Sequence, residues 1–144
     1  MIGFLSAIET LAAHELIHKR ENYNKYLGLL SLSKIFYCHF KDEHVQGHHK
    51  KVATEIDPST SRMNESLYQY VPREIIGTHI SMWKLEVKRL RKQHGDDAFM
   101  ALILFNRLVW YTVLQNCICL TVYFTLGWAS LKAQFVFGAV GLFY

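Results

Sequence analysis

The sequence predicts an all-α integral membrane protein, a helical bundle accompanied by helices at the membrane interface and in the cytosol. The first observation is a run of 24 residues from Leu108 to Leu131 without a charged side chain. About 20 apolar residues in a helix suffice to cross the hydrocarbon core of a bilayer. The second is that apolar residues elsewhere recur at the helical spacing of three and four. Because the chain begins in an apolar helix and ends in an apolar run, the bundle is expected to be incomplete.

Length and charge limit the organisation of the chain. Its 144 residues are expected to form part of one domain, 1–144. Ten of the 16 Lys and Arg residues lie between Lys41 and Lys92, and the positive-inside rule assigns that stretch to the cytosolic side. The net charge of +4 therefore indicates membrane orientation, and no aromatic and basic module predicts a nucleic-acid partner. Three cysteines, two of them in the apolar run, predict no disulfide framework.

The N-terminal part of the chain is expected to approach and then follow the membrane surface. Ile2 to Lys19 has the composition of one helix, so that residues 1–19 form the end of a helix that leaves the membrane. Asn22 to Phe40 is too short to cross a bilayer twice, and a single crossing would separate His14 and His18 from the histidines after Phe40. The segment is therefore expected to lie along the interface or to re-enter the protein, with an ordinary buried helix as the alternative. Its expected apolar face consists of Tyr26, Leu29, Leu30, Phe36, Tyr37 and Phe40.

The middle region, 22–97, is expected to be interfacial and cytosolic. Ile56 to Arg62 contains an Asp-Pro-Ser sequence typical of a turn. Arg73 to Gln93 follows as an amphipathic basic helix suited to the anionic headgroups of a membrane. Gly95 is expected to end that helix.

Residues 98–144 predict a transmembrane hairpin. Phe99 to Leu126 is expected to cross the membrane, and the turn is expected near Gly127 or Lys132. Ala133 to Tyr144 then returns toward the cytosolic side.

Five of the eight histidines fall into two clusters. His14 and His18 are four residues apart, and so are His44 and His48, with His49 directly after them. On an α-helix such pairs share one face, and His49 is displaced by about 100°. Imidazole is a common ligand of iron, zinc, copper and nickel, so the clusters predict a metal site. A single histidine more often has a structural role, and that interpretation is kept for His79 and His94.

Both clusters lie in longer motifs that resemble a known family. His14 to Lys19 is H-E-L-I-H-K, Glu43 to His49 is E-H-V-Q-G-H-H, and the second motif continues through V-A-T-E-I-D-P-S-T-S-R-M. These segments resemble the first two histidine boxes of the membrane-bound non-haem di-iron alkane 1-monooxygenases, the alkane hydroxylases. That family lies within the superfamily of integral-membrane fatty-acid desaturases and hydroxylases. Two further boxes of the family, N-Y-x-E-H-Y-G and L-Q-R-H-S-D-H-H, do not occur, so a fragment with an incomplete site is expected.

The resemblance implies a specific site and reaction. The five clustered histidines would be ligands of two non-haem iron ions, and Glu15, Glu43 and Asp57 would accept hydrogen bonds from their outer ring nitrogens. For Glu15 and Glu43, a solvated charge at a helix end is equally compatible with the sequence. The reaction would be the terminal hydroxylation of n-alkanes by O2 and reduced rubredoxin. The histidine boxes would face the cytosol from a bacterial inner membrane, in contact with lipid.

Other functions fit parts of the same pattern. A fatty-acid desaturase or ω-hydroxylase of the same superfamily would act on fatty-acyl substrates at a similar metal centre. A catalytically silent, truncated membrane protein would retain the boxes without a reaction. A metal carrier is the least favoured, because the histidines lie at helix ends and not along a pore.

Overall fold

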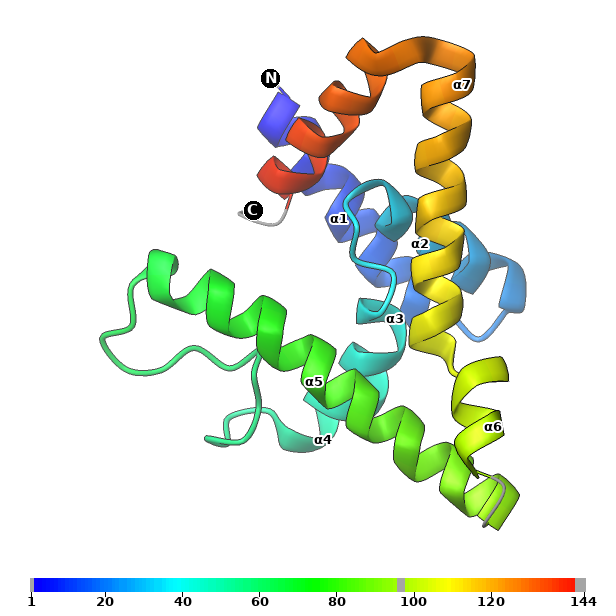
Figure 1. Cartoon of the computed structure of the whole chain (residues 1–144). Coiled ribbons are helices and arrows are strands. Elements are labelled where there is room, and N and C mark those ends of the chain that lie inside the picture. Colours follow the sequence, from blue (N-terminus) through cyan, green and yellow to red (C-terminus); the bar gives the residue numbers. More distant parts are fainter. Residues whose placement is uncertain (1, 96–97, 142–144) are drawn as a thin grey trace. The chain divides into compact units, whose positions relative to one another are not determined.

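The computed structural model describes residues 2–95 and 98–141. Its elements in chain order are α1 (Ile2–His18), α2 (Asn22–Lys34), α3 (Phe40–Glu43), a π-helical turn η1 (His44–His48), α4 (His49–Lys51), α5 (Leu67–His94), α6 (Ala98–Leu104) and α7 (Arg107–Gly141) (Figure 1). The described residues contain no strand, which confirms the predicted all-α class. Residues 96–97 and 142–144, which belong to the predicted cytosolic region and returning segment, lie outside the described residues.

The chain forms two compact units, which are described in turn. Unit 1 consists of Met1–Lys41 and Thr112–Tyr144, and unit 2 of Asp42–Tyr111. The first histidine pair belongs to unit 1 and the second cluster belongs to unit 2.

Unit 1 is built on the packing of α1 against α2. A Cβ atom added to Gly28 would lie 2.9 Å from Ile17 Cγ2 and 3.1 Å from the Ala13 carbonyl oxygen, so the two helices meet where α2 has no side chain. The apolar core of this unit comprises Ala13, Ile17, Leu32, Ile35 and Tyr37, with Phe40 and Phe137 packed against it. This contact fixes the last turn of α1, which carries His14 and His18.

The predicted apolar face from Tyr26 to Phe40 is wrong in its second half, because α2 ends at Lys34. Phe36 adopts a left-handed conformation with φ of 60°, which stops the helix. Tyr37 turns into the core, whereas Tyr26 and Leu30 stay exposed. The exposed part of the predicted face is therefore restricted to α2 itself.

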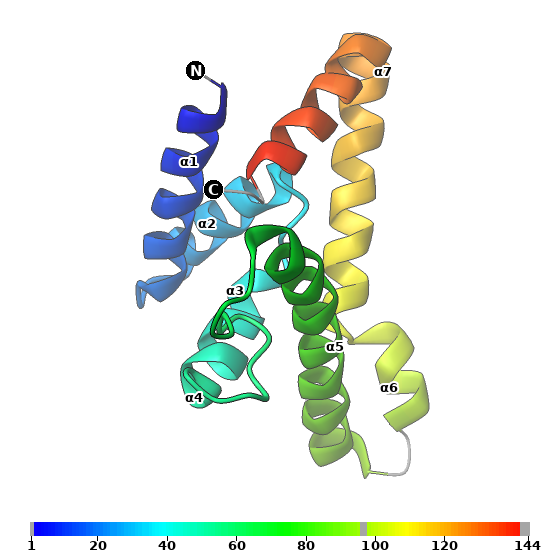
Figure 2. The same ribbon diagram turned by 90° about the vertical axis from the view of Figure 1, so that its left-hand side faces the viewer.

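The long apolar segment includes most of α6 and α7. Among the described residues, the stretch Phe99–Ala139 is long and apolar enough to cross a membrane by length and composition. Figure 2 shows that α7 reverses its direction within its length. The break is at Gly127, whose φ of 80° and ψ of 178° favour glycine, and this is one of the two positions where the sequence predicts a turn. Behind the turn, Phe135 stacks on Phe36 with ring centroids 4.8 Å apart.

Unit 2 is organised along α5, which begins six residues before the predicted helix at Arg73. Ser66 and Gln69 form a capping box, with reciprocal hydrogen bonds between the side chain of each and the backbone of the other. This cap starts the helix upstream, and Pro72 is accommodated inside it. The helix ends at His94 with Gly95 at its C-cap, as the sequence predicts.

The segment 52–66 has no regular structure, which confirms the predicted turn around Pro58. The Arg73 guanidinium fastens this loop to α5. It donates two hydrogen bonds to the Glu65 carboxylate (2.5 and 2.6 Å), one to the Pro58 carbonyl oxygen (2.9 Å) and one to the Thr60 carbonyl oxygen (3.0 Å). The hydrogen bonds from the Arg73 guanidinium and from the Arg62 N–H lower the pKa of Glu65 to about 2, so the clamp is fully charged at neutral pH.

The predicted continuous helix from Phe99 to Leu126 is interrupted between α6 and α7, at Phe105 and Asn106. The fully buried Asn106 accepts a hydrogen bond from the Leu108 N–H (2.9 Å) and thereby caps α7. The N–H of Arg107 donates to the Glu86 carboxylate (2.8 Å). Hydrogen bonds to the polar side chains of Asn106 and Glu86 therefore stabilise the start of α7, within unit 2.

Candidate metal centre

The second histidine cluster lies on a π-helical turn and not on the α-helix that its spacing predicts. The N–H of His49 donates to the carbonyl of His44, five residues earlier, which is the hydrogen bond of a π-helix. The wider turn brings residues five apart onto the same face. His44 Nε2 and His49 Nε2 consequently lie 3.0 Å apart, with ring centroids separated by 4.5 Å.

This geometry corrects the expected arrangement, in which His44 and His48 share a face and His49 is displaced. The rings of His44 and His48 stack at 5.2 Å, but the nitrogens that converge belong to His44 and His49. His48 and His49 have ring centroids 5.9 Å apart. The three imidazoles therefore do gather in one small volume.

Asp57 lies within hydrogen-bond distance of the third imidazole, that of His48. Its Oδ2 lies 2.7 Å from His48 Nδ1 and also accepts a hydrogen bond from Thr60 Oγ1 (2.5 Å), while its Oδ1 accepts one from the Ser59 N–H (3.2 Å). The carboxylate is fully buried. Burial alone would raise the pKa of Asp57, but the hydrogen bonds from Thr60, Ser59 and His48 outweigh it and lower the pKa. An ionised Asp57 keeps the proton on Nδ1 and leaves His48 Nε2 with a free lone pair.

Glu43 is placed differently from Asp57. Its side chain is fully buried, and neither carboxylate oxygen has a hydrogen-bond partner among the described residues. A Cβ atom on Gly47 would lie 2.4 Å from Glu43 Oε1 and 3.3 Å from Ser81 Oγ, so the carboxyl group occupies the space that the glycine leaves free. Burial raises the pKa of Glu43.

The first cluster, in unit 1, has a similar internal geometry. His14 Nε2 and His18 Nε2 lie 3.3 Å apart at the end of α1, with the rings edge to face at 4.8 Å. Glu15 is exposed, and its carboxylate is 3.6 Å from His14 Nδ1, which is longer than a hydrogen bond. Within each cluster, therefore, two imidazole nitrogens lie close together.

The remaining histidines make structural contacts. His79 Nδ1 lies 2.8 Å from the Ile75 carbonyl oxygen, and His94 stacks on Phe105 with parallel rings 5.7 Å apart. His39, to which the sequence assigns no role, is buried and packs edge to face on Tyr37 at 4.6 Å.

Sequence reasoning missed a charged network that fixes the π-turn in unit 2. The Asp42 carboxylate, two residues before His44, accepts a hydrogen bond from Arg107 Nη1 (2.7 Å) and one from the Tyr111 hydroxyl. Glu86 is nearly fully buried and receives a bidentate contact from Arg89 (2.9 and 2.7 Å). One available signal was Glu86 itself, an isolated acidic residue in the basic part of α5.

The donor set fits a transition metal. Nitrogens 3.0 and 3.3 Å apart are close enough for each pair to bind one ion, and the outer nitrogen of His48 is already bonded to a carboxylate. This arrangement of an imidazole backed by a carboxylate is typical of metal ligands. Imidazole alone suits iron, copper, nickel and zinc, so the geometry defines the class of ion and not its identity.

The described residues thus combine a stretch that is long and apolar enough to cross a membrane with two histidine clusters that could hold metal ions. The fatty acid desaturase family matches the whole chain, residues 1–144. The chain belongs to that family.

Curated relatives point to one branch of the family. The chain is 41% identical over 92 residues to the alkane 1-monooxygenase of Ectopseudomonas oleovorans, covering 64% of this chain and 23% of that protein. It is 33% identical over 151 aligned positions to alkane 1-monooxygenase 2 of Alcanivorax borkumensis, covering 98% of this chain and 38% of the relative. Alkane 1-monooxygenase 1 of the same organism is 42% identical over 91 residues. The chain spans between about a fifth and two fifths of the length of these relatives.

Proposed function

We propose that the whole protein is an alkane 1-monooxygenase that converts an n-alkane and O2 to the 1-alkanol. The observation that carries this proposal is the pair of converging nitrogens on His44 and His49, with His48 held by Asp57 beside them. The names of the relatives supply the substrate class.

The five clustered histidines would serve as ligands of two non-haem iron ions. His14 and His18 would contribute one pair of nitrogens, and the η1 turn would contribute His44, His48 and His49. Bound iron would supply the redox chemistry that activates O2. The carboxylate of Asp57 would orient His48 by accepting a hydrogen bond from its Nδ1–H. Carboxylates commonly do this for histidines that bind a metal.

The chemistry of the substrate favours a redox metal. A terminal methyl group has no acidic proton and no electrophilic carbon, so side-chain acids, bases and nucleophiles have nothing to act on. The apolar stretch Phe99–Ala139 offers a surface compatible with a hydrocarbon substrate drawn from the bilayer.

Partners and location follow from the same proposal. Reduced rubredoxin would supply electrons, and the basic region 41–92 would meet its acidic surface on the cytosolic side of a bacterial inner membrane. Membrane lipid would surround the apolar segment of α7.

A product assay tests the proposed reaction. The whole protein, supplied with an n-alkane, O2, rubredoxin and its reductase, should yield the 1-alkanol in gas chromatography. A desaturase would instead form an olefin from fatty-acyl substrates, and a silent membrane protein would form neither product. Either of these results would overturn the proposal.

A metal assay tests the ligands separately from turnover. His48→Ala should abolish activity and lower the bound iron measured by elemental analysis of the purified whole protein. His94→Ala is the matched control, because His94 stacks on Phe105 and is not in either cluster. Unchanged iron content in the His48 variant would contradict its assignment as a ligand.

A further inference from the structure

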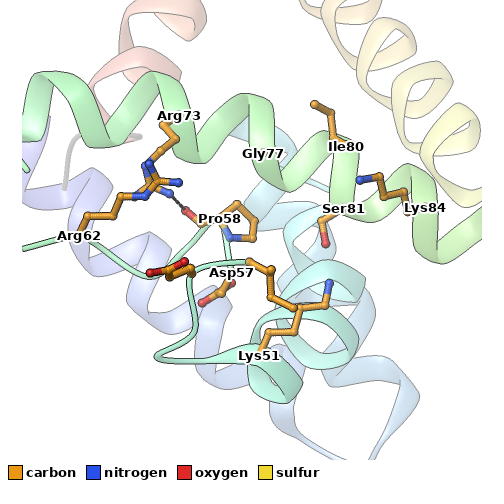
Figure 3. Close-up of a pocket in the computed structure, with 11 residues that line it drawn as sticks. Lys51, Asp57, Pro58, Arg62, Arg73, Gly77, Ile80, Ser81 and Lys84 are labelled. Atoms are coloured by element: carbon orange, nitrogen blue, oxygen red, sulfur yellow. Dashed lines mark hydrogen bonds between the residues drawn. The ribbon is translucent and has the colours of Figure 1, made fainter.

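A cavity of about 260 Å³ lies in unit 2 between α5 and the loop after α4 (Figure 3). Its walls come from a short helix end, the loop and one face of α5. The lining residues are Lys51, Glu55, Ile56, Asp57, Pro58, Arg62, Arg73, Gly77, Ile80, Ser81 and Lys84.

Positive charge dominates the lining. Four of these residues are Lys or Arg and two are acidic. The carboxylate of one of the two acids, Asp57, is already hydrogen-bonded to His48, Thr60 and Ser59. Arg73 is neutralised by Glu65, which leaves Lys51, Arg62 and Lys84 opposite the single exposed carboxylate of Glu55.

The base of the cavity is closed and polar. A Cβ atom on Gly77 would lie 2.5 Å from Pro58 Cβ, so the loop rests directly on α5 at this point. Ser81 is 7% exposed, and its hydroxyl faces the buried carboxyl group of Glu43 beside Gly47. Figure 3 shows Ser81 and Lys84 on α5 among the residues that line the cavity. The cations that flank this base suit an anion that accepts several hydrogen bonds.

Two isoleucines, Ile80 on α5 and Ile56 in the loop, make part of the cavity rim apolar. Ile80 is 49% exposed and Ile56 is 74% exposed. Lys84 also lines a second groove of about 410 Å³, together with Trp83, Val87, Lys88 and Arg91. The cationic cavity thus opens beside exposed isoleucine and tryptophan side chains, which is the arrangement that a charged headgroup with attached hydrocarbon requires.

We propose that this cavity binds a phosphate group, held by Lys51, Lys84 and Arg62. The apolar rim favours the phosphate of an anionic phospholipid headgroup, whose acyl chains would lie on Ile80 and Trp83. Free inorganic phosphate has the same chemistry and is separated from lipid in the experiment. The site is independent of iron and of the hydroxylation reaction, and its test uses neither.

The test measures binding to the full 144-residue chain in a neutral detergent. Native mass spectrometry and titration calorimetry compare three probes: short-chain phosphatidylglycerol, phosphatidylcholine and inorganic phosphate. Phosphatidylglycerol should bind at least about tenfold more tightly than phosphatidylcholine, because each Lys or Arg near an anionic headgroup contributes a several-fold gain.

A matched pair of double variants locates the site. Lys51→Gln with Lys84→Gln should weaken binding of phosphatidylglycerol by about tenfold or more. Lys50→Gln with Lys92→Gln removes the same charge from the same two helices outside the cavity, and should change binding less than threefold. Lys51→Arg with Lys84→Arg should retain binding, which excludes a general loss of structure.

Each outcome decides the matter. Binding of phosphatidylglycerol that only the cavity variant weakens supports a lipid headgroup, and equivalent behaviour of inorganic phosphate supports a site for free phosphate. Equal weakening by both double variants would overturn the proposal in favour of a diffuse basic surface. The proposal would also be overturned if neither phosphatidylglycerol nor inorganic phosphate bound to the chain.

Discussion

Replacement of Asp57 by asparagine tests how His48 is prepared to bind metal. The buried carboxylate accepts three hydrogen bonds, from His48, Thr60 and Ser59. An amide has a single oxygen, so at least one of these donors would face an NH2 group. The charge that fixes the proton on His48 Nδ1 would also be lost.

The expected magnitude follows from the hydrogen bond. A bond to a charged group contributes about 1.5–3 kcal/mol, and a tenfold change in affinity corresponds to about 1.4 kcal/mol. Asp57→Asn should therefore lower the affinity for metal by about 10-fold to 100-fold, the range measured when such outer partners are removed.

The assay is a Co²⁺ titration of the whole, metal-depleted protein, followed by visible absorption. Glu55→Gln is the control, because it removes an exposed carboxylate from the same loop. An Asp57→Asn protein that binds Co²⁺ within threefold of the parent would refute the proposed orientation of His48 by Asp57. Thermal unfolding of the same samples separates a loss of affinity from a loss of fold.

Three further predictions concern unit 2. Gly47→Ala should lower the free energy of unfolding by about 1–3 kcal/mol, because the new methyl group would meet Glu43 Oε1 at 2.4 Å in a buried site. Arg107→Gln should destabilise the protein by about 1–3 kcal/mol, because it leaves the nearly buried carboxylate of Asp42 without its cation. Glu65 should titrate near pH 2 in an NMR experiment, and its clamp should contribute stability that is complete above about pH 4.5 and lost as the pH falls through 2.

Each of these three predictions has its own control or contradictory result. Glu43→Asp shortens the buried side chain by one methylene, and it should recover stability in the Gly47→Ala background. Failure of this rescue would contradict the steric explanation. Arg91→Gln removes a charge from an exposed position on α5 and should be neutral within about 0.5 kcal/mol. A Glu65 titration at the ordinary glutamate value would show that the clamp does not form in solution.

Local sequence features were sufficient to predict some of the helix boundaries. The apolar composition of Ile2–Lys19 predicted α1 to within one residue, and Gly95 marked the end of α5. The start of α5 was missed because the capping box of Ser66 and Gln69 lies before the periodic apolar residues. In that case a hydrogen bond to the backbone decides the boundary, and hydrophobic periodicity carries no information about it.

The sequence could not predict the ion pairs around the site that join residues far apart in the chain. The two histidine clusters could be recognised because the spacing within each cluster is local. The partner of Asp42, however, is Arg107, which is 65 residues away and follows a helix break. A periodic pattern contains no information about which carboxylate a given arginine meets. Burial supplies the physical constraint, because a nearly buried carboxylate requires a partner, but burial is known only from the fold.

The π-turn follows from the interplay of Gly47 and Glu43. A regular α-helix through His44, His48 and His49 would align His44 with His48 and direct His49 elsewhere. The structure inserts one extra residue in the turn, and the converging pair becomes His44 and His49. Such turns have poorer hydrogen-bond geometry and persist where surrounding contacts hold them. Here the fully buried Glu43 fills the space at Gly47, so the close approach of the His44 and His49 nitrogens depends on a glycine that has no side chain of its own.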